Sequence, residues 1–500
     1  MKRFLIVIFI VVFSISFLSG NSFNFDSVKK RITKFKLENG LTFILLEDHS
    51  VPIVSFVTYA NVGSSDERIG IYGISHFLEH LAFKGTTEVG TRNPAKERAV
   101  LDKMDRIFNE ILIERSRINP DNEKIKKLKK DLDGVRNEAS KFVVSNEFDT
   151  ILKRNGGVGL NAGTSSDSTV YFYSLPSNKI ELWAYLESGR FSYPVFREFY
   201  KEREVIKEER RLRTENSPIG KLIEELQAIA FKDHPYKVSV IGPMSNINHI
   251  SRSDVKAYFR KHYTAKNLVI GVAGDVTPGN LKKLVKRYFT KIRSGEKNER
   301  VFTIEPKQPG EKRMTLHEDS QPWVLMAYHC PSELSPDFSK FEVLNYILTN
   351  GRSSRLNKKM VSKDKSAMAV GSFAGFPGSK YPSLYLIFAL PNMKHSTAEM
   401  EKVISSEIEK LKTEKISDEE LISAKNRIKV DSIKRMKSNQ GLLNGLLRAE
   451  VVQGGWEKLF DSIVETDKVT ADDIMNLAKT YFTDNNKVLI KIEKKKEVKK

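Results

Sequence analysis

Short runs of apolar and β-branched residues open the folded part of the chain, at positions 34–37, 41–46 and 53–59. Runs of this length, bounded by polar and turn-forming residues, predict β-strands. Asn39 and Gly40 separate the first two runs, and Asn-Gly is a typical hairpin turn. We therefore expect a β-hairpin and a third strand, in a sheet that lies behind the helix that follows.

Residues 93–148 have a helical period instead. Apolar positions recur every three or four residues on both sides of a turn at 119–121, which is heptad-type spacing. This predicts an antiparallel coiled-coil hairpin, either projecting as an arm or packed on the domain as a helical pair. The apolar positions are Val100, Met104, Ile107, Ile111 and Ile118, then Ile125, Leu128, Leu132, Val135, Ala139 and Phe142.

The composition is 40% hydrophobic and 29% charged over 500 residues, which indicates a soluble globular protein of two or more domains. Cys330 is the single cysteine, so an intramolecular disulfide framework and a cysteine-rich zinc site are both excluded. The formal net charge is +20, but lysine and arginine are spread along the chain without a zinc-finger, RNP or Walker pattern. We therefore expect a lysine-rich solvated surface and no nucleic-acid partner.

The first 22 residues read as a signal peptide, because Lys2 and Arg3 precede an apolar run at 4–17. An uncleaved anchor is the alternative, and membrane association is expected only through this segment. Either reading predicts an exported protein in the periplasm or cell envelope.

Two domains follow. Charged residues with proline and glycine at 296–312 indicate a linker between an N-terminal domain, 23–295, and a C-terminal domain, 313–500. The N-terminal domain contains the 93–148 insertion. In the C-terminal domain a strand is expected from Trp323 and a helix over 341–348, and a capping box at 417–420 should open a long helix. Mixed elements in both domains predict an α+β fold.

The chemistry centres on the sequence His76-Phe77-Leu78-Glu79-His80. Residues four apart share a helix face, so His76 and His80 can bind one ion, and Glu79 is placed to take a proton from a bound water. This H-x-x-E-H pattern is typical of inverzincin zinc peptidases. The alternative is that both histidines lie on the surface of an amphipathic helix and bind no metal.

A third ligand should come from another rigid element. The run 199–210 is strongly helical, and a glutamate there would complete an open, catalytic type of zinc site. Spacing alone leaves Glu202, Glu208 and Glu209 nearly equal.

A glycine-rich turn at 155–164 leads into an aromatic, β-branched strand at 168–173. No Gly-Lys-Ser/Thr follows, so a phosphate-binding loop is not indicated. An edge strand in this region would hold an extended peptide by β-augmentation.

Together these residues resemble the pitrilysin/insulinase family of zinc metallopeptidases, in particular its smaller bacterial and mitochondrial-processing-peptidase-like members. The similarity covers nearly the whole exported chain. The matching segments are 37–41, 76–80, 83–86, 161–164, 202–209, 234–236, 267–274 and 351–356.

The resemblance implies a fold of two related α/β domains that form one half of a clamshell. It selects Glu209 as the third ligand, because the family's metal-binding glutamate closes an E-R-x-V-I-x-x-E run, and it gives Glu202 a supporting role. Asn161 and Thr164 are expected to support the site or bind substrate. The implied function is an exported endopeptidase with one Zn²⁺ per chain that hydrolyses oligopeptides or unfolded polypeptides.

One departure from the family bears on activity. Members usually complete the site with an Arg and a Tyr downstream of the S-R-L run, where this chain has Val361 and Met368. We therefore expect a heterodimer in which a homologous partner supplies both side chains. Tyr381, Arg352 or Arg355 could substitute from within the chain, and a non-catalytic, structural subunit of the same fold is the alternative function.

Overall fold

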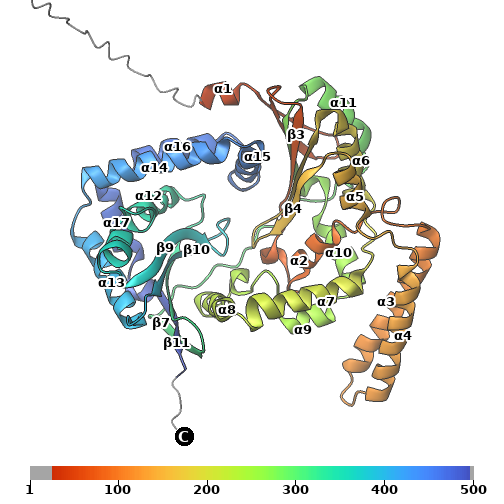
Figure 1. The fold of residues 1–500 in the computed structure, drawn as a ribbon, viewed down its shortest axis with the longest axis horizontal. Coiled ribbons are helices and arrows are strands. Elements are labelled where there is room, and N and C mark those ends of the chain that lie inside the picture. Colours follow the sequence, from red (N-terminus) through yellow and green to blue (C-terminus); the bar gives the residue numbers. More distant parts are fainter. Residues whose placement is uncertain (1–24, 496–500) are drawn as a thin grey trace, which may run out of the picture.

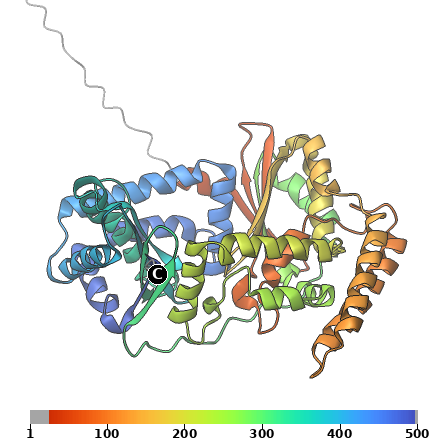
Figure 2. The ribbon, with the colours of Figure 1, turned by 60° about the horizontal axis from the view of Figure 1, so that its bottom comes forward.

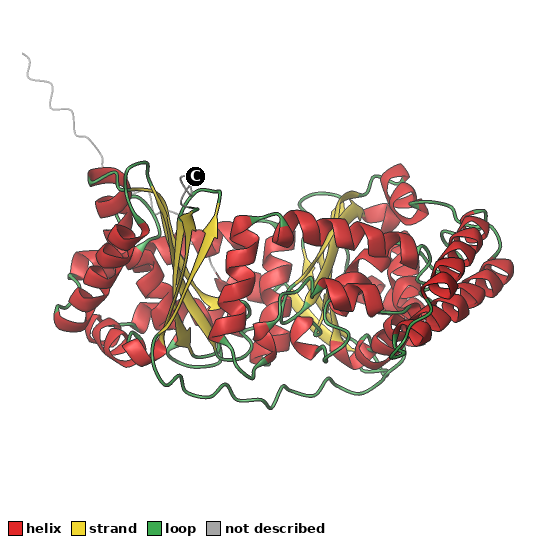
Figure 3. Ribbon diagram, turned by 90° about the horizontal axis from the view of Figure 1, so that it is seen from below, coloured by secondary structure: helices red, strands yellow, loops and turns green. Residues whose placement is uncertain are grey.

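The computed structural model describes residues 25–495, so the predicted signal peptide at 1–22 lies outside the described residues. Two β-sheets stand side by side, with helices packed between them and on their outer sides (Figure 3). This arrangement confirms the predicted α+β class. In the part of the chain that the structure describes, no helix has the length and apolar content to cross a membrane.

The N-terminal sheet has six strands. The predicted hairpin is present, because β1 and β2 pair antiparallel with Ile32 opposite Leu46, and Gly40 in the turn has a φ of 97°. Glycine adopts this left-handed conformation at little cost, which explains the Asn-Gly turn. In sheet order the strands are β1 (Ile32–Lys36), β2 (Thr42–Glu47), β6 (Leu268–Gly274), β3 (Ile53–Ala60), β5 (Thr169–Pro176) and β4 (Val158–Thr164).

The glycine-rich segment differs from the prediction. Its second part is not a turn but strand β4, which pairs with β5 and forms a free edge of the sheet. The edge strand expected in this region is therefore β4, while β5 lies between β3 and β4. Val158, Leu160 and Ala162 alternate with Gly159, Asn161 and Gly163 in β4, but two of the seven residues are glycines, and glycine is also a turn signal.

The C-terminal half contains a five-stranded sheet flanked by helices. The predicted strand at Trp323 is β8, and the capping box is formed, because Glu420 N donates to Ser417 Oγ at 3.2 Å. In sheet order the strands are β7 (Lys312–Glu318), β11 (Lys487–Lys494), β8 (Trp323–Cys330), β10 (Ser383–Pro391) and β9 (Ala367–Phe376). The helices of this half are α12 (Phe338–Leu348), α13 (Thr397–Thr413), α14 (Asp418–Met436), α15 (Asn439–Arg448), α16 (Lys458–Lys468) and α17 (Ala471–Tyr481).

Two helices are exchanged between the halves. Helix α8 (Pro218–Ala230) belongs to the N-terminal half but buries Leu222 and Leu226 against the C-terminal sheet. Helix α15 belongs to the C-terminal half but packs on β6 and β3 of the N-terminal sheet, as Figure 1 shows. Each sheet is thus covered on one face by a helix from the other half, and two hydrophobic clusters are shared.

The remaining helices surround the N-terminal sheet. They are α1 (Phe25–Lys29), α2 (Ile74–Leu81), α5 (Glu147–Arg154), α6 (Ile180–Ser192), α7 (Phe199–Arg210), α9 (Met244–His249), α10 (Arg252–His262) and α11 (Pro278–Tyr288). From the last of these, an extended connection that includes the linker 296–312 runs along one side of the molecule to β7 (Figure 2). Glu305 anchors this connection, because its carboxylate accepts hydrogen bonds from the backbone of Lys232, Asp233 and His234 at 2.6–3.0 Å.

The predicted helical hairpin consists of α3 (Pro94–Arg115) and α4 (Asn122–Ser140), which extend away from the body as an arm (Figures 1 and 2). Most predicted core positions face the partner helix or the domain. Ile118 is an error in that prediction, because it lies in the turn beyond the end of α3 and has 99% of its surface exposed.

Because α15 packs on the sheet of the other half, its buried side chains should stabilise the folded chain. Leu443 on α15 is fully buried against the N-terminal sheet. Leu443→Ala should lower the free energy of unfolding by about 2–5 kcal/mol, the usual cost of a buried leucine truncation. Chemical denaturation measures this, and the exposed Ile422→Ala on α14 is the matched control, with an expected change under about 0.5 kcal/mol. Equal effects of the two substitutions would contradict a shared core.

Candidate metal centre

The helix that carries the histidines is fixed at its first turn. Gly73 precedes α2 with a φ of 94°, and a β-carbon there would lie 2.5 Å from the carbonyl oxygen of Ile241. Glu67 accepts hydrogen bonds from the backbone nitrogens of Gly73 at 2.7 Å and Ser75 at 2.8 Å. A carboxyl group whose oxygens accept hydrogen bonds from the free N–H groups of a first turn anchors the helix start.

The three predicted ligands meet. Glu209 Oε2 lies 3.6 Å from His76 Nε2 and 3.2 Å from His80 Nε2. Donor atoms placed 2.0–2.2 Å from one tetrahedral zinc ion would be about 3.3 Å apart, so both distances to Glu209 fit the metal, and all three donor atoms lie within 4.8 Å of one another. His76, His80 and Glu209 are also the cluster of potential metal ligands found among the described residues.

Charged neighbours surround this set. Glu202 Oε2 lies 3.4 Å from His80 Nδ1, the arrangement that fixes ring orientation in metal-binding histidines. Lys84 Nζ is 2.5 Å from Glu202 Oε1, and Arg213 Nη1 is 2.8 Å from Glu209 Oε1. The sequence analysis missed both cations. Spacing in the sequence could have indicated them, because Lys84 follows His80 by four residues and Arg213 follows Glu209 by four.

The remaining predicted residues lie beside the ligands. Thr164 Oγ1 donates a hydrogen bond of 2.6 Å to Glu79 Oε2, so Thr164 orients the predicted base. Asn161 is exposed on β4. Glu79, Asn161 and Thr164 line one cavity of about 1110 Å³ together with the three ligands. Its lining residues all lie between His76 and Ile241, so the N-terminal half builds it.

The two histidines differ in charge. Burial, reinforced by the neighbouring His80, lowers the pKa of His76 to about 4. Burial also acts to lower the pKa of His80, but hydrogen bonds to Glu202 and Glu209 outweigh it and raise that pKa to about 9. In the metal-free protein at neutral pH, His76 is therefore neutral and His80 is protonated.

The three residues proposed as internal substitutes for the Arg and Tyr are elsewhere. Arg355 pairs with Glu420 at 2.7 and 2.8 Å, and the hydroxyl of Tyr381 accepts a hydrogen bond from Val301 N at 3.0 Å. Arg352 is exposed in the turn after α12. None of the three lines the cavity at the metal centre, as the structure describes it.

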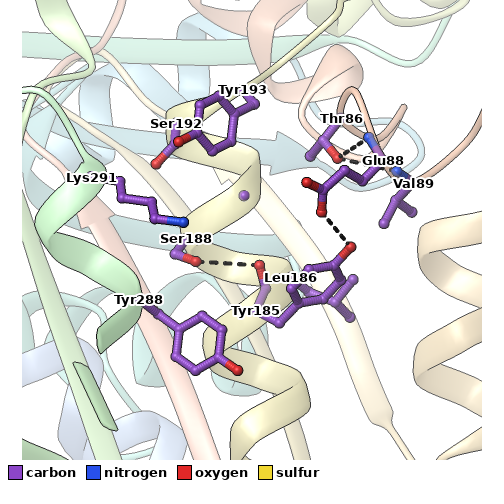
Figure 4. Close-up of a pocket in the computed structure, with 11 residues that line it drawn as sticks. Thr86, Glu88, Val89, Tyr185, Leu186, Ser188, Ser192, Tyr193, Tyr288 and Lys291 are labelled. Atoms are coloured by element: carbon purple, nitrogen blue, oxygen red, sulfur yellow. Dashed lines mark hydrogen bonds between the residues drawn. The ribbon is translucent and has the colours of Figure 1, made fainter. Parts of the chain in front are cut away.

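A second, smaller pocket of about 80 Å³ lies between α6 and the segment after α2 (Figure 4). Tyr185 donates a hydrogen bond of 2.8 Å to Glu88 at its rim, and Tyr193, Tyr288 and Lys291 complete its polar wall. No histidine or cysteine stands among its lining residues. It therefore lacks the donor set of the cavity at His76.

Two family models match the chain. The Insulinase (Peptidase family M16) model covers residues 42–109, which include His76, Glu79 and His80, and the Peptidase M16 inactive domain model covers residues 249–428. The resemblance to the pitrilysin/insulinase family is confirmed, because the chain carries domains of this family.

Relatives that match over most of their length support the family assignment. Zinc protease PqqE of Helicobacter pylori is 28% identical over 94% of this chain and 95% of its own. Mitochondrial-processing peptidase subunit beta of Saccharomyces cerevisiae is 24% identical over 88% of this chain and 86% of its own. A solved protease from Helicobacter pylori superposes with a TM-score of 0.76 at 27% identity, covering 92% of this chain and 99% of that one.

Zinc binding should depend on pH. Zn²⁺ binding near pH 7.5 should release about one proton, because a histidine ligand must be neutral and His80 is protonated up to about pH 9. Affinity should therefore rise from pH 6 toward pH 9. Titration calorimetry in buffers of different ionisation enthalpy counts the proton. Glu202→Gln removes a partner that raises the pKa of His80, so this variant should release fewer protons on zinc binding. If the heat of zinc binding to the native protein did not depend on the buffer, protonated His80 would not be a zinc ligand.

Proposed function

We propose that this chain is a zinc-dependent endopeptidase that hydrolyses peptide bonds in oligopeptides or unfolded polypeptides. One observation carries the proposal. His76, His80 and Glu209 converge at zinc-ligand spacing, and Glu79 lies beside them in a cavity large enough for a peptide segment. Family membership supports the same class, since relatives of the chain are named zinc proteases.

The chain's own residues have distinct roles in this chemistry. A bound Zn²⁺ would polarise the scissile carbonyl and lower the pKa of a water molecule. Glu79 accepts the proton of the attacking water and delivers it to the leaving amine. Thr164 holds one oxygen of Glu79 by its 2.6 Å hydrogen bond, which leaves the other oxygen for proton transfer.

Strand β4 is the proposed substrate platform. It is a free edge of its sheet, and Asn161, Ala162, Gly163 and Thr164 on it line the cavity. An edge strand offers unpaired backbone N–H and C=O groups that can pair with an extended peptide. Recognition through backbone groups suits a peptidase for unfolded chains, because it does not depend on the substrate's side chains.

The proposal includes a homologous partner subunit. Val361 and Met368 occupy the positions where the family usually has Arg and Tyr, and no residue of the C-terminal half is among those that line the cavity. A positive or hydrogen-bonding group near the metal would stabilise the oxyanion, and losing such a donor costs about 10²–10³ in rate. A partner that closes over the cavity would supply it.

Export is the remaining part of the proposal. Residues 1–22 have the charge and apolar pattern of a secretory signal, which would place the folded chain in the periplasm or cell envelope. Peptide substrates in such a compartment would come from outside the cytoplasm or from exported proteins. The proposed metal site does not depend on export, because all residues of the site lie outside residues 1–22.

Substitution of the base separates metal binding from catalysis. Glu79→Gln should retain stoichiometric zinc, because Glu79 is not a ligand, while hydrolysis falls by about 10²–10⁴-fold through loss of proton transfer. Elemental analysis measures the zinc content, and a peptide-cleavage assay in the presence of a co-expressed homologue measures hydrolysis. Glu208→Gln is the matched control, since Glu208 lines the same cavity but points to Arg211. Normal turnover of Glu79→Gln would exclude the proposed mechanism.

The partner requirement is tested with the zinc-loaded chain alone and with a co-expressed homologue that carries the Arg and Tyr. Activity on a mixture of unfolded peptides should appear only with the homologue and should vanish when the homologue's Arg is replaced by Ala. Full activity of the isolated chain would refute the two-subunit arrangement. Inactivity in both preparations, despite bound zinc, would favour the structural-subunit alternative.

A further inference from the structure

The distal end of the α3–α4 arm, residues 113–130, is here called the hairpin tip, and it exposes two isoleucines among polar residues, Ile113 in α3 and Ile118 in the turn. Ile118 has 99% of its surface exposed and Ile113 has 61%. Neither belongs to the hydrophobic clusters of the described residues, whereas Met104 and Phe108, nearer the body, are buried. The tip isoleucines therefore contribute little to folding, and their surface is open to an external partner.

The hairpin tip is also strongly basic. Five lysines fall within residues 124–130, and one of them, Lys124, pairs with Glu114 at 2.8 Å. The other four are exposed and form no ion pair with any residue that the structure describes. They are Lys126, Lys127, Lys129 and Lys130. Their helix turns Ile125 toward α3, so the lysine side chains are directed away from the packed face.

An exposed isoleucine at the end of an arm whose second helix carries unpaired lysines fits a surface that offers negative charge outside and hydrocarbon beneath. A bilayer with anionic headgroups has both properties, and basic amphipathic elements bind it through both. A soluble acidic macromolecule would pair with the lysines but would leave Ile118 in water. We infer that the hairpin tip is a docking surface for an anionic lipid bilayer, with Ile118 entering the interface and the lysines contacting the headgroups.

The base of the arm is joined to the helices around the metal centre. Arg252 and Lys256 on α10 pair with Asp105 of α3 at 2.9 and 3.3 Å. Arg203 of α7 lies over the ring of Phe108 at 4.1 Å from its centroid. Helix α7 also carries Glu209, so a docked arm would set the orientation of the cavity relative to the bilayer. This inference does not rest on the proposed function.

The experiment places an environment-sensitive fluorophore at the tip of the full chain as Ile118→Cys. The native Cys330 does not compete, because it is buried and burial raises its pKa to about 11. Met393→Cys, 82% exposed in the C-terminal half, is the control label. A position-specific label also distinguishes docking of the tip from any membrane binding by the N-terminal segment. Vesicles of phosphatidylglycerol are compared with vesicles of phosphatidylcholine.

The label at 118 should shift to the blue with phosphatidylglycerol vesicles, not with phosphatidylcholine, and less at high salt. The variant K126E/K127E/K130E should bind at least about 100-fold more weakly, since each basic residue near an anionic surface contributes roughly fivefold. K282E/K283E/K286E on α11 is the control with the same change in charge, and unchanged thermal midpoints exclude misfolding.

Three outcomes would overturn the inference. They are no shift of the label at 118 at low salt, an equal shift with neutral vesicles, and a shift that survives in K126E/K127E/K130E. Binding to a soluble acidic polymer with the same affinity and no blue shift would assign the tip to an acidic macromolecule instead.

Discussion

The metal centre depends on one packing contact between two helices that are far apart in the chain. Helix α2 provides two ligands and α7 the third, so the donor atoms meet only if the helices keep a fixed register. Between them, the rings of Phe77 and Phe199 stack with centroids 4.6 Å apart and planes 12° from parallel. Both rings are buried, so the close-packed side chains around them leave little room for sliding or rotation. The contact therefore sets the spacing of the ligands.

Helix α7 is in turn held by its surroundings on both sides. Arg203 donates to the carbonyl of Ile250 at 2.6 Å, and Arg210 donates to the carbonyl of Gly242 at 2.7 Å and to Glu224 of α8. A short π-helical segment, Arg211–Glu215, joins α7 to α8. Since α8 packs on the C-terminal sheet, the position of the third ligand is coupled to the other half of the chain. The exchanged helix thus gives the C-terminal half a structural role in a site it does not line.

Local features of the site and fold were predictable from the sequence because their cause is local. The Asn-Gly turn, the capping box at Ser417 and the paired histidines each depend on residues within four positions. Sequence spacing could not show that His76 and Glu209 converge. It left Glu202, Glu208 and Glu209 as nearly equal candidates for the third ligand, and only the family resemblance selected Glu209. The structure brings Glu209 to the histidines and Glu202 behind His80.

The features that the sequence did not reveal depend on contacts between distant residues or on exposure to solvent. The helix exchange joins residues far apart in the chain, such as Lys221 and Glu318, which are 97 positions apart. Neither α8 nor α15 differs in pattern from a helix that covers its own sheet. Strand β4 turns only Leu160 and Ala162 toward the core, and the glycines between its apolar residues resemble a turn. Ile118 fits the heptad spacing, but the helix ends three residues earlier, and a periodic pattern does not state where a helix stops.

The charges around the metal centre explain why two cations stand behind it. Glu202 is paired with Lys84, and Glu209 with Arg213, so these two carboxylates are balanced within the protein. In the metal-free state the proton on His80 adds a positive charge near Glu79. On the proposed chemistry a divalent ion replaces that proton, and together with the Glu79 carboxylate it leaves one net positive charge. When Glu79 has accepted the proton of the attacking water it is neutral, so the two positive charges of the ion would face the single negative charge on the carbonyl oxygen, and the cations paired with Glu202 and Glu209 would keep these carboxylates from offsetting that attraction.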